Sequence, residues 1–175
     1  YPPPVIPQHL VVVGSGVTGV EFVHMFKSLG SEVTLIVSRQ QVLPSKDPEV
    51  AAALEADFLA RGVRLYKGAR AIGADVDETG VTLRCDDGRT ARGTHVLLAI
   101  GSIPNSEYLG LEAIGVETRD GYVVIDHNCK STVPSIYAAG DVVGRYMLEH
   151  AAGKEGKVAA DNALTGGSLG VDYPS

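Results

Sequence analysis

The chain has 175 residues, of which 45% are hydrophobic and 21% charged, and its formal net charge is −6 at pH 7. This composition is typical of a folded globular protein and excludes a mainly disordered chain. The acidic balance argues against a nucleic-acid partner, and the longest apolar runs are too short for the ~20 residues of a membrane span, so no membrane partner is expected.

The first residues and the two cysteines indicate whether the chain is part of a longer protein and in which cell compartment it lies. Tyr1 is followed by three prolines, which indicates an extended linker, so we expect a piece of a longer protein. No charged-then-apolar leader is visible at the start. Cys85 and Cys129 stand far apart and outside any Cys-x-x-Cys motif, so we expect them to act as small, semi-buried hydrophobic side chains, and no metal site is expected. Together these features predict a cytoplasmic protein.

The first 37 residues have the pattern of a βαβ unit. Apolar runs predict buried strands over residues 9–13 and 32–37, and apolar residues at helical spacing predict a helix over 17–29. Asp47 and Pro48 then mark the start of a second helix that ends near residue 61. The fold class expected is therefore α/β, with a Rossmann-type three-layer βαβ domain.

The rest of the chain reads as short strands followed by one more helix. A third strand is expected over 63–66, then a β-meander with a hairpin between 80–84 and 90–95, turning at Asp86-Asp87-Gly88, and a buried strand over 96–100. Ser102 marks the expected boundary, which gives domains over 1–102 and 103–175. In the second, strands are expected over 122–125 and 135–139, and a helix over 151–164.

Residues 14–19 read GSGVTG and lie between the first strand and the first helix. In this context Gly14 permits a tight turn, Gly16 leaves room for a pyrophosphate, and Gly19 allows close packing of helix and strand. The helix N-terminus then offers N–H groups and a partial positive charge to the phosphates. The alternative is a glycine-rich turn that binds nothing.

Two further positions lie where ligands bind in open α/β sheets. Ser38 and Arg39 follow the second strand, where NAD-binding sites usually carry an acid, so the pair favours NADP or tolerance of both NADP and NAD. The alternative for Arg39 is a solvated surface charge. Gly140 and Asp141 follow the predicted strand over 135–139 and place a carboxylate at its end; the alternative for Asp141 is a residue that caps a turn.

Four segments together resemble one protein family. They are residues 14–21 (GSGVTGVE), 99–105 (AIGSIPN), 137–142 (YAAGDV) and 148–151 (LEHA) followed by Gly156. In this order they are similar to the motifs of the pyridine nucleotide-disulfide oxidoreductases, which are flavoprotein reductases that bind two dinucleotides. The match is close to the dihydrolipoamide dehydrogenase-like branch. The Ser38–Arg39 pair is more similar to members that act as NAD(P)H quinone reductases or soluble transhydrogenases.

The resemblance implies a site for NAD(P) in the first domain and part of a site for FAD in the second. Glu21 would lie near the nicotinamide carboxamide, although it is also an ordinary acid of a first helical turn, and His150 is equally a capping or packing histidine. The implied NAD(P) contacts are Gly14, Ser15, Gly16, Val17, Thr18, Gly19, Glu21, Ser38, Arg39 and Gly101. The implied FAD contacts are Gly140, Asp141, Leu148, Glu149, His150 and Ala151.

The resemblance is partial. The family's first FAD motif, its C-x-x-x-x-C disulfide and its dimerisation domain are absent, so the chain is expected to be an NAD(P)-binding fragment without catalytic residues. The implied whole protein is a homodimer that passes hydride from NAD(P)H to FAD and on to a disulfide, quinone or second nucleotide. The missing FAD and dimerisation domains would be its partners. The alternative is a stand-alone, non-catalytic dinucleotide-binding or redox-sensing module.

Overall fold

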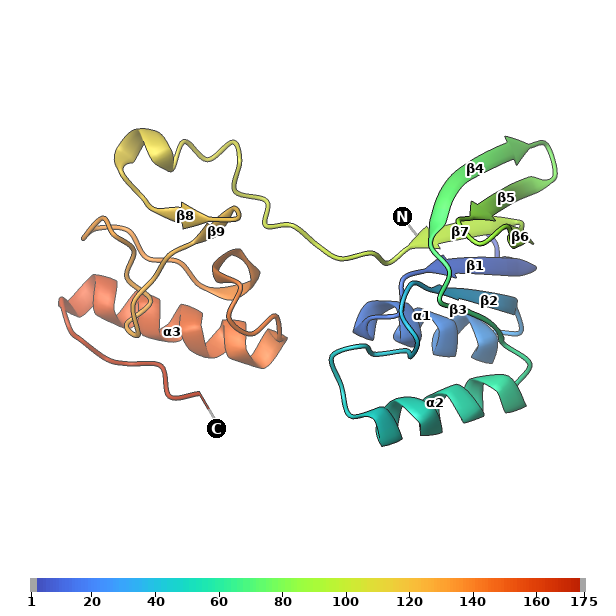
Figure 1. Ribbon diagram of the computed structural model, residues 1–175. Helices are drawn as coiled ribbons and strands as arrows, with labels where there is room; N and C mark the ends of the chain where they lie inside the picture. Colours follow the sequence, from blue (N-terminus) through green and yellow to red (C-terminus); the bar gives the residue numbers. More distant parts are fainter. Residues whose placement is uncertain (1–2, 174–175) are drawn as a thin grey trace. The chain divides into compact units, whose positions relative to one another are not determined.

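The computed structural model describes residues 3–173, and the chain divides into two compact units. Unit 1 extends to Gly101 and unit 2 begins at Ser102 (Figure 1). None of the described helices is both long enough and apolar enough to span a membrane.

A parallel sheet forms the centre of unit 1. It contains β1 (His9–Val13), β2 (Glu32–Val37), β3 (Arg64–Lys67) and β7 (His95–Leu98), in the order β3-β2-β1-β7. Helix α1 (Val17–Ser28) connects β1 to β2, and α2 (Pro48–Ala60) connects β2 to β3. The predicted βαβ unit is therefore confirmed.

The helix α2 begins where the sequence predicts. The Asp47 carboxylate accepts hydrogen bonds from the N–H groups of Glu49 at 2.8 Å and Val50 at 3.4 Å, and Pro48 is the first helical residue. The cap satisfies N–H groups that have no partner within the helix, and proline at this position has no N–H to satisfy.

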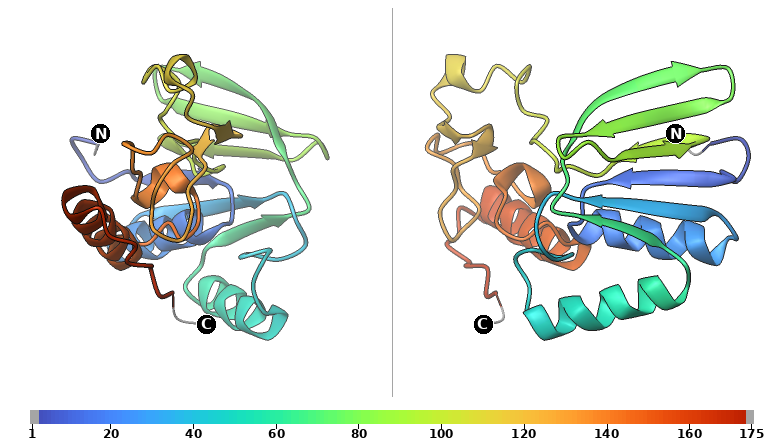
Figure 2. Two further views of the ribbon diagram at one scale, coloured as in Figure 1. Left: turned by 90° about the vertical axis from the view of Figure 1, so that its left-hand side faces the viewer. Right: turned by 45° about the vertical axis from the view of Figure 1, so that its right-hand side comes forward.

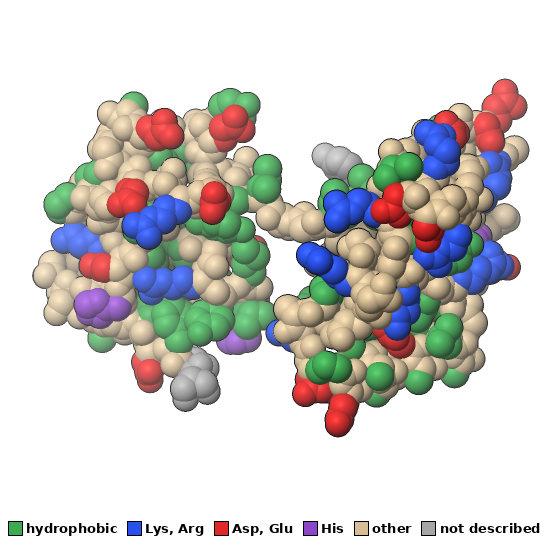
Figure 3. Space-filling model, in the orientation of Figure 1, with side chains coloured by type: hydrophobic (Ala, Val, Ile, Leu, Met, Phe, Trp, Pro, Cys, Tyr) green, Lys and Arg blue, Asp and Glu red, His purple; other side chains and the backbone are tan. Residues whose placement is uncertain are grey.

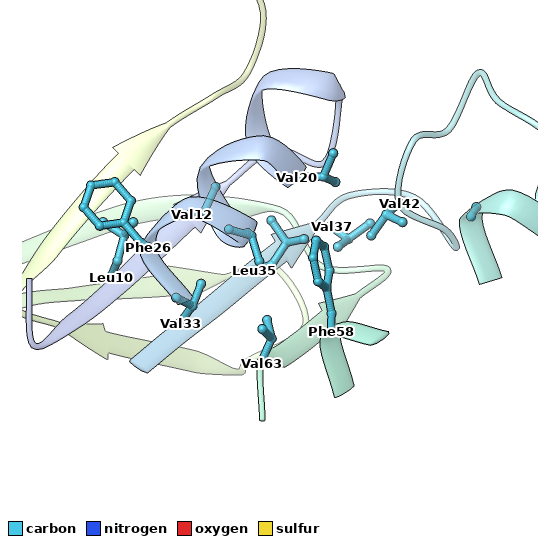
Figure 4. Close-up of a cluster of buried hydrophobic side chains, with 12 residues drawn as sticks. Leu10, Val12, Val20, Phe26, Val33, Leu35, Val37, Val42, Phe58 and Val63 are labelled. Carbon is cyan, nitrogen blue, oxygen red and sulfur yellow. The ribbon is translucent and has the colours of Figure 1, made fainter. Parts of the chain in front are cut away.

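Both helices cover one face of the parallel sheet. Figure 4 shows Phe26 of α1 and Phe58 of α2 directed at the alternate residues of β1 and β2 that face them. Phe58 is fully buried. Because successive strand residues point to opposite faces, the intervening residues are free to build a second core on the other side of the sheet.

An antiparallel meander covers that other face. It consists of β4 (Ala71–Asp77), β5 (Gly80–Cys85) and β6 (Thr90–Gly93), in the order β4-β5-β6 (Figure 2). Leu83, Cys85 and Ala91 pack there against Val11 and Ile36 of the parallel sheet. The three layers are thus helices, parallel sheet and meander, which confirms the fold class.

The sequence places the end of the meander incorrectly. The strand predicted over 90–95 ends at Gly93, and β7 begins at His95 in the other sheet. A β-carbon at Gly93 would lie 2.8 Å from the carbonyl oxygen of His9. Glycine therefore allows the backbone to cross from one sheet to the other at this close approach.

Unit 2 contains little regular structure. Its elements are two 3₁₀ turns, η1 (Glu112–Ile114) and η2 (Gly140–Val143), a two-stranded ribbon of β8 (Thr118–Arg119) and β9 (Tyr122–Val123), and helix α3 (Glu149–Thr165). Cys129, Val158 and Ala159 form its buried cluster. The predicted helix over 151–164 is confirmed and is slightly longer than expected.

Two strand predictions in unit 2 are wrong in whole or in part. Residues 135–139 form no strand; Tyr137 makes a single bridge with Lys130. The strand expected over 122–125 ends at Val123, and Ile125 makes only a bridge with Ser131. A strand requires a partner along its length, and the described residues provide one at isolated positions only.

Candidate functional site

The turn after β1 is shaped by two glycines that the protein itself requires. Gly14 has a φ of 106°, and a β-carbon there would collide with the carbonyl oxygen of Ala99 after β7. A β-carbon at Gly19 would collide with the carbonyl oxygen of Gly14. These two positions keep β1, β7 and α1 close together, which the motif predicts for the first and third glycines.

Gly16 differs from Gly14 and Gly19 because nothing in the protein requires it to be glycine. Its φ is −69°, and a β-carbon there would meet no atom within 4 Å. Gly16 caps α1 without a side-chain hydrogen bond, and the first intrahelical bond runs from Val20 N–H to its carbonyl at 3.1 Å. The N–H groups of Val17, Thr18 and Gly19 therefore have no acceptor within the helix, and no acid occupies its first turn.

A cleft of about 360 Å³ opens at the carboxyl end of the parallel sheet. Hydrogen bonds fix the loops around it: Gly14 N–H donates to the carbonyl of Ile36 at 3.1 Å, and Leu43 N–H donates to that of Ser15 at 2.7 Å. Figure 3 shows Lys and Arg side chains at this edge of unit 1, where β7 ends. The cleft is lined by Val13, Gly14, Ile36, Ser38, Ala69, Arg70, Ala71 and Ile100.

The structure brings some of the expected NAD(P) contacts together. Ser38 shares the cleft with Gly14, and the exposed Arg39 follows it on the same loop. That loop is anchored by Glu55, whose carboxylate accepts from Val42 N–H at 2.9 Å and pairs with Lys67 at 2.7 Å. Ser15 is buried, whereas Val17 and Thr18 are exposed at the start of α1.

Glu21 and Gly101 do not line this cleft. Both are exposed: Glu21 lies on α1 beyond its first turn, and Gly101 is the last residue of unit 1. A β-carbon at Gly101 would meet nothing within 4 Å. Their assignment as NAD(P) contacts stays a prediction.

The expected FAD contacts lie in unit 2 in two groups. Gly140 is buried and Asp141 is exposed at the start of η2, and Asp141 shares a cleft of about 330 Å³ with Pro104, Tyr122 and Met147. The second group is the N-terminus of α3, namely Leu148, Glu149, His150 and Ala151. Leu148 caps this helix without a side-chain hydrogen bond, Glu149 and His150 are exposed, and Ala151 is buried.

Glu155 is a functional candidate that sequence reasoning missed. It is fully buried on α3, and its carboxylate accepts a hydrogen bond from Gly140 N–H at 2.7 Å and another from the Tyr173 hydroxyl. The bonds fix the turn that presents Asp141. An acid in a helical pattern normally indicates a solvated face, so the sequence carries no signal for this burial.

Arg70 is the second missed residue. It follows β3 and lines the cleft with Ser38. β2 and β3 are parallel neighbours, so their carboxyl ends meet at one edge of the sheet and bring the two following loops together. Sequence pattern alone does not give this strand order, so it carries no signal for Arg70.

Neither cysteine is poised for chemistry. Burial raises the pKa of the Cys85 thiol, and burial together with the Glu155 carboxylate raises that of Cys129. Both thiols therefore stay protonated near neutral pH and act as small buried side chains. Within residues 3–173, no three His, Cys, Asp or Glu side chains are grouped to hold a metal ion.

Comparison with known proteins assigns the chain to a family. Residues 3–156 match the family model described as pyridine nucleotide-disulphide oxidoreductase. The chain belongs to this family. The match covers both the glycine loop of unit 1 and the Gly140–Asp141 turn of unit 2, as the sequence resemblance implies.

Curated relatives are oxidoreductases of the same kind. The chain is 44% identical over 160 residues to an NAD(P)H dehydrogenase (quinone) of Mycobacterium tuberculosis, which covers 91% of this chain and 32% of that protein. It is 36% identical over 172 residues to the dihydrolipoyl dehydrogenase of Geobacillus stearothermophilus, covering 96% and 36%. The chain thus spans about a third of the length of the relatives that it matches.

Solved structures agree. The crystal structure of LpdA from Mycobacterium tuberculosis matches with a TM-score of 0.86 and 43% identity, over 96% of this chain and 37% of that one. The water-forming NADH oxidase from Lactobacillus brevis, solved with NADH bound, matches with a TM-score of 0.82 and 26% identity, over 90% and 37%.

Proposed function

We propose that the chain supplies the NAD(P)-binding domain (1–102) and a second FAD-domain segment (103–175) of an FAD-dependent NAD(P)H oxidoreductase. The observation that carries the proposal is Gly16. Its side chain is absent although neither backbone conformation nor packing requires this, and the space lies at an uncapped helix N-terminus. A pyrophosphate fits both properties.

The first unit binds and orients the nicotinamide dinucleotide. The N–H groups of Val17, Thr18 and Gly19 donate to the pyrophosphate. The first turn of α1 contains no acidic residue, so no carboxylate neutralises the partial positive charge at this helix end. Glu21 lies farther along α1, where it holds the carboxamide. When bound, the nicotinamide and the flavin together supply the hydride chemistry, which moves two electrons and one proton from the first to the second.

The second unit contributes part of the flavin site. Asp141 is exposed on a turn fixed by Glu155, so it is free to accept hydrogen bonds from a ribityl or phosphate group. The uncapped N-terminus of α3 directs a partial positive charge outward, which favours an anionic ring edge. The exposed Glu149 opposes that charge unless its side chain turns away. The onward acceptor is a disulfide, a quinone or a second nucleotide.

The loop after β2 favours NADPH. Ser38 and Arg39 stand where an acid would select NADH by repelling a 2′-phosphate. The chain is therefore expected to bind NADPH at least as well as NADH. Arg39→Glu should weaken NADPH binding by about 1–3 kcal/mol, the scale of a charged hydrogen bond. A titration in which NADH binds more than about tenfold tighter than NADPH would contradict this.

The glycine loop provides the central experiment. Gly16→Val should abolish binding of NADPH and NADH, measured by titration calorimetry, because the added side chain enters pyrophosphate space. Circular dichroism should show an unchanged fold, since a β-carbon at Gly16 meets no protein atom. Gly153→Val is the matched control, at an exposed α3 glycine where a β-carbon also meets nothing. Normal binding by a folded Gly16→Val chain means that the site is assigned wrongly.

Flavin retention provides a second experiment. The chain contains one G-x-G-x-x-G loop, which unit 1 uses for NAD(P), so the 175-residue chain is expected to bind nucleotide without retaining FAD stoichiometrically. It should accordingly not oxidise NADPH with a quinone or dye. The measurement is flavin absorbance per chain after purification with added FAD. A yellow, active preparation would show that this chain suffices to retain FAD, against the prediction.

A further inference from the structure

Two arginines stand apart from the rest because their guanidinium groups have no partner among the described residues. These are Arg39 and Arg70, and both are exposed. The other arginines donate to a carboxylate or carbonyl of the chain: Arg61 to Asp57, Arg64 to Glu32, Arg84 to Asp75, Arg89 to Asp87, Arg92 to Asp77, Arg119 to Glu117 and Arg145 to Ile125. Two uncompensated cations in one region of an acidic chain require an explanation.

The backbone places these two arginines on adjoining loops. Gly68 N–H, in the loop after β3, donates to the carbonyl oxygen of Arg39 at 3.0 Å, and Ala69 N–H donates to that of Val37 at 3.1 Å. Arg70 is the next residue. It lines the cleft together with Ser38 and Gly14, so the loops after β1, β2 and β3 converge there.

Arg70 is held in place by the meander. Its N–H donates to the Asp86 carboxylate at 2.9 Å, and its carbonyl accepts from Asp86 N–H at 3.0 Å. This pair of bonds fixes the backbone of Arg70 while its guanidinium stays free. An exposed arginine on an anchored backbone loses less freedom on binding a ligand than one on a mobile loop.

We propose that Arg70 is a second cationic contact for the 2′-phosphate of NADPH, opposite Arg39 and beside the hydroxyl of Ser38. The inference rests on the proposed function, and it adds a specificity residue from another part of the chain. A phosphate monoester carries a charge near −2 at neutral pH and offers three acceptor oxygens, so it has room for two guanidinium groups. Guanidinium groups match phosphate oxygens in pairs of hydrogen bonds.

The carboxylate of Asp86 makes the proposal sharper. Asp86 accepts the Arg70 N–H, so its charge lies close to the proposed phosphate and opposes it. Its neighbour Asp87 is paired with Arg89 and contributes less. Asp86→Asn keeps an oxygen acceptor for the Arg70 N–H and removes the charge. This variant should therefore strengthen NADPH binding and leave NADH binding unchanged.

The test is nucleotide binding by the full 175-residue chain, measured for NADPH and NADH. Arg70→Gln should weaken NADPH by about tenfold or more and change NADH by less than about threefold, since a charged hydrogen bond to the 2′-phosphate is lost. Arg70→Lys should recover part of the NADPH affinity because it keeps the charge. Arg64→Gln is the matched control, since it removes an arginine from the amino end of β3.

Competition by small phosphates identifies the group that Arg70 contacts. 2′-AMP, 3′-AMP and 5′-AMP are titrated against bound NADPH in the wild-type chain and in Arg70→Gln. The substitution should weaken 2′-AMP selectively. Equal weakening of all three would overturn the proposal in favour of a general anion surface.

Two further results would overturn the inference. In the first, folded Arg70→Gln has the same ratio of NADPH affinity to NADH affinity as Arg64→Gln, while Gly16→Val still abolishes binding. This result leaves the proposed function intact and removes Arg70 from the site. The other is a wild-type chain that binds neither nucleotide, which removes both. If Arg70→Gln does not fold, the Asp86→Asn variant decides: unchanged NADPH binding there counts against the proposal.

Discussion

The two units bury their hydrophobic side chains to different extents. Unit 1 has two continuous cores, one on each face of its parallel sheet, and the central strands are almost wholly buried. Unit 2 has a cluster of Cys129, Val158 and Ala159, while Ile103 and Tyr108 are 90% and 89% exposed. The long parallel sheet and the meander therefore belong to the unit with continuous cores, whereas unit 2 has only the short β8–β9 ribbon and isolated bridges.

Dissecting the chain should produce the largest effect. Residues 1–101 expressed alone are expected to unfold in one cooperative transition, because both of their cores lie within them. Residues 102–175 alone are expected to self-associate or to melt without a cooperative transition, because their buried cluster is small and side chains such as Ile103 and Tyr108 are exposed. Thermal circular dichroism and sedimentation velocity measure both. A monomeric 102–175 segment with a sharp transition would remove the contrast.

Core substitutions should show the same contrast on a smaller scale. Phe58→Ala empties a fully buried position in the larger core and is expected to destabilise unit 1 by about 3–5 kcal/mol. Val158→Ala in α3 removes less volume from a smaller cluster and should cost less. Urea unfolding of each variant in the full chain gives the two values. Equal costs, despite the smaller volume removed from α3, would mean that Val158 is packed more tightly than Phe58 and would contradict the contrast.

The Glu155 carboxylate tests whether polar bonds compensate for the small core of unit 2. Glu155→Ala leaves the Gly140 N–H and the Tyr173 hydroxyl without their acceptor, and should cost about 1–3 kcal/mol. Glu155→Gln keeps an oxygen acceptor and should cost less. Faster hydrogen exchange of the Gly140 amide in the full chain is the measurement, and the exposed Glu149→Ala is the control. An unchanged exchange rate in Glu155→Ala would show that the bond does not stabilise the turn.

The contrast between the units also explains which sequence predictions hold. The βαβ unit, the Asp47 cap and the hairpin at Gly88 have local signals: apolar periodicity, a capping carboxylate and a turn dipeptide. The strand β4 was covered only by a general expectation of a meander, since Ile72 and Val76 are 65% and 77% exposed and give no buried pattern. Residues 135–139 have the apolar residues of a strand, but they form only one bridge, between Tyr137 and Lys130. A strand also needs a neighbouring segment to pair with, and the apolar pattern of a sequence does not show whether one is present.

The candidate site follows the same division. The glycine loop is predictable because its glycines have the motif spacing and lie between a predicted strand and a predicted helix, and Ser38 and Arg39 follow from their place after the second strand. Arg70 requires knowledge that β3 lies beside β2, and Glu155 requires knowledge that a helical acid faces inward. Both are facts of tertiary packing rather than of sequence pattern. Sequence reasoning therefore reaches the site's first loops and misses the residues that other elements bring to them.

The smallest expected effect is a pH dependence of unit 1 that originates at His9. Its side chain lies at the start of β1 and is 17% exposed, with Nε2 2.8 Å from the hydroxyl of Thr34. Burial lowers the pKa of His9, as does the nearby Arg64, and Glu32 opposes this shift. The neutral imidazole is therefore the form that the fold favours.

The sign of this effect follows from linkage. Above the ordinary value of 6.5, His9 is neutral in both states and its contribution to stability is fully present. As the pH falls below 6.5, the unfolded chain takes up a proton first, so the free energy of unfolding decreases. Urea unfolding of unit 1 at pH 8, 7, 6 and 5 should show a decline that is shallower in His9→Gln. His150→Gln lies in unit 2 and should leave the unit 1 transition unchanged. If the free energy of unfolding falls equally with pH in the wild-type chain and in His9→Gln, the acid sensitivity belongs to other groups.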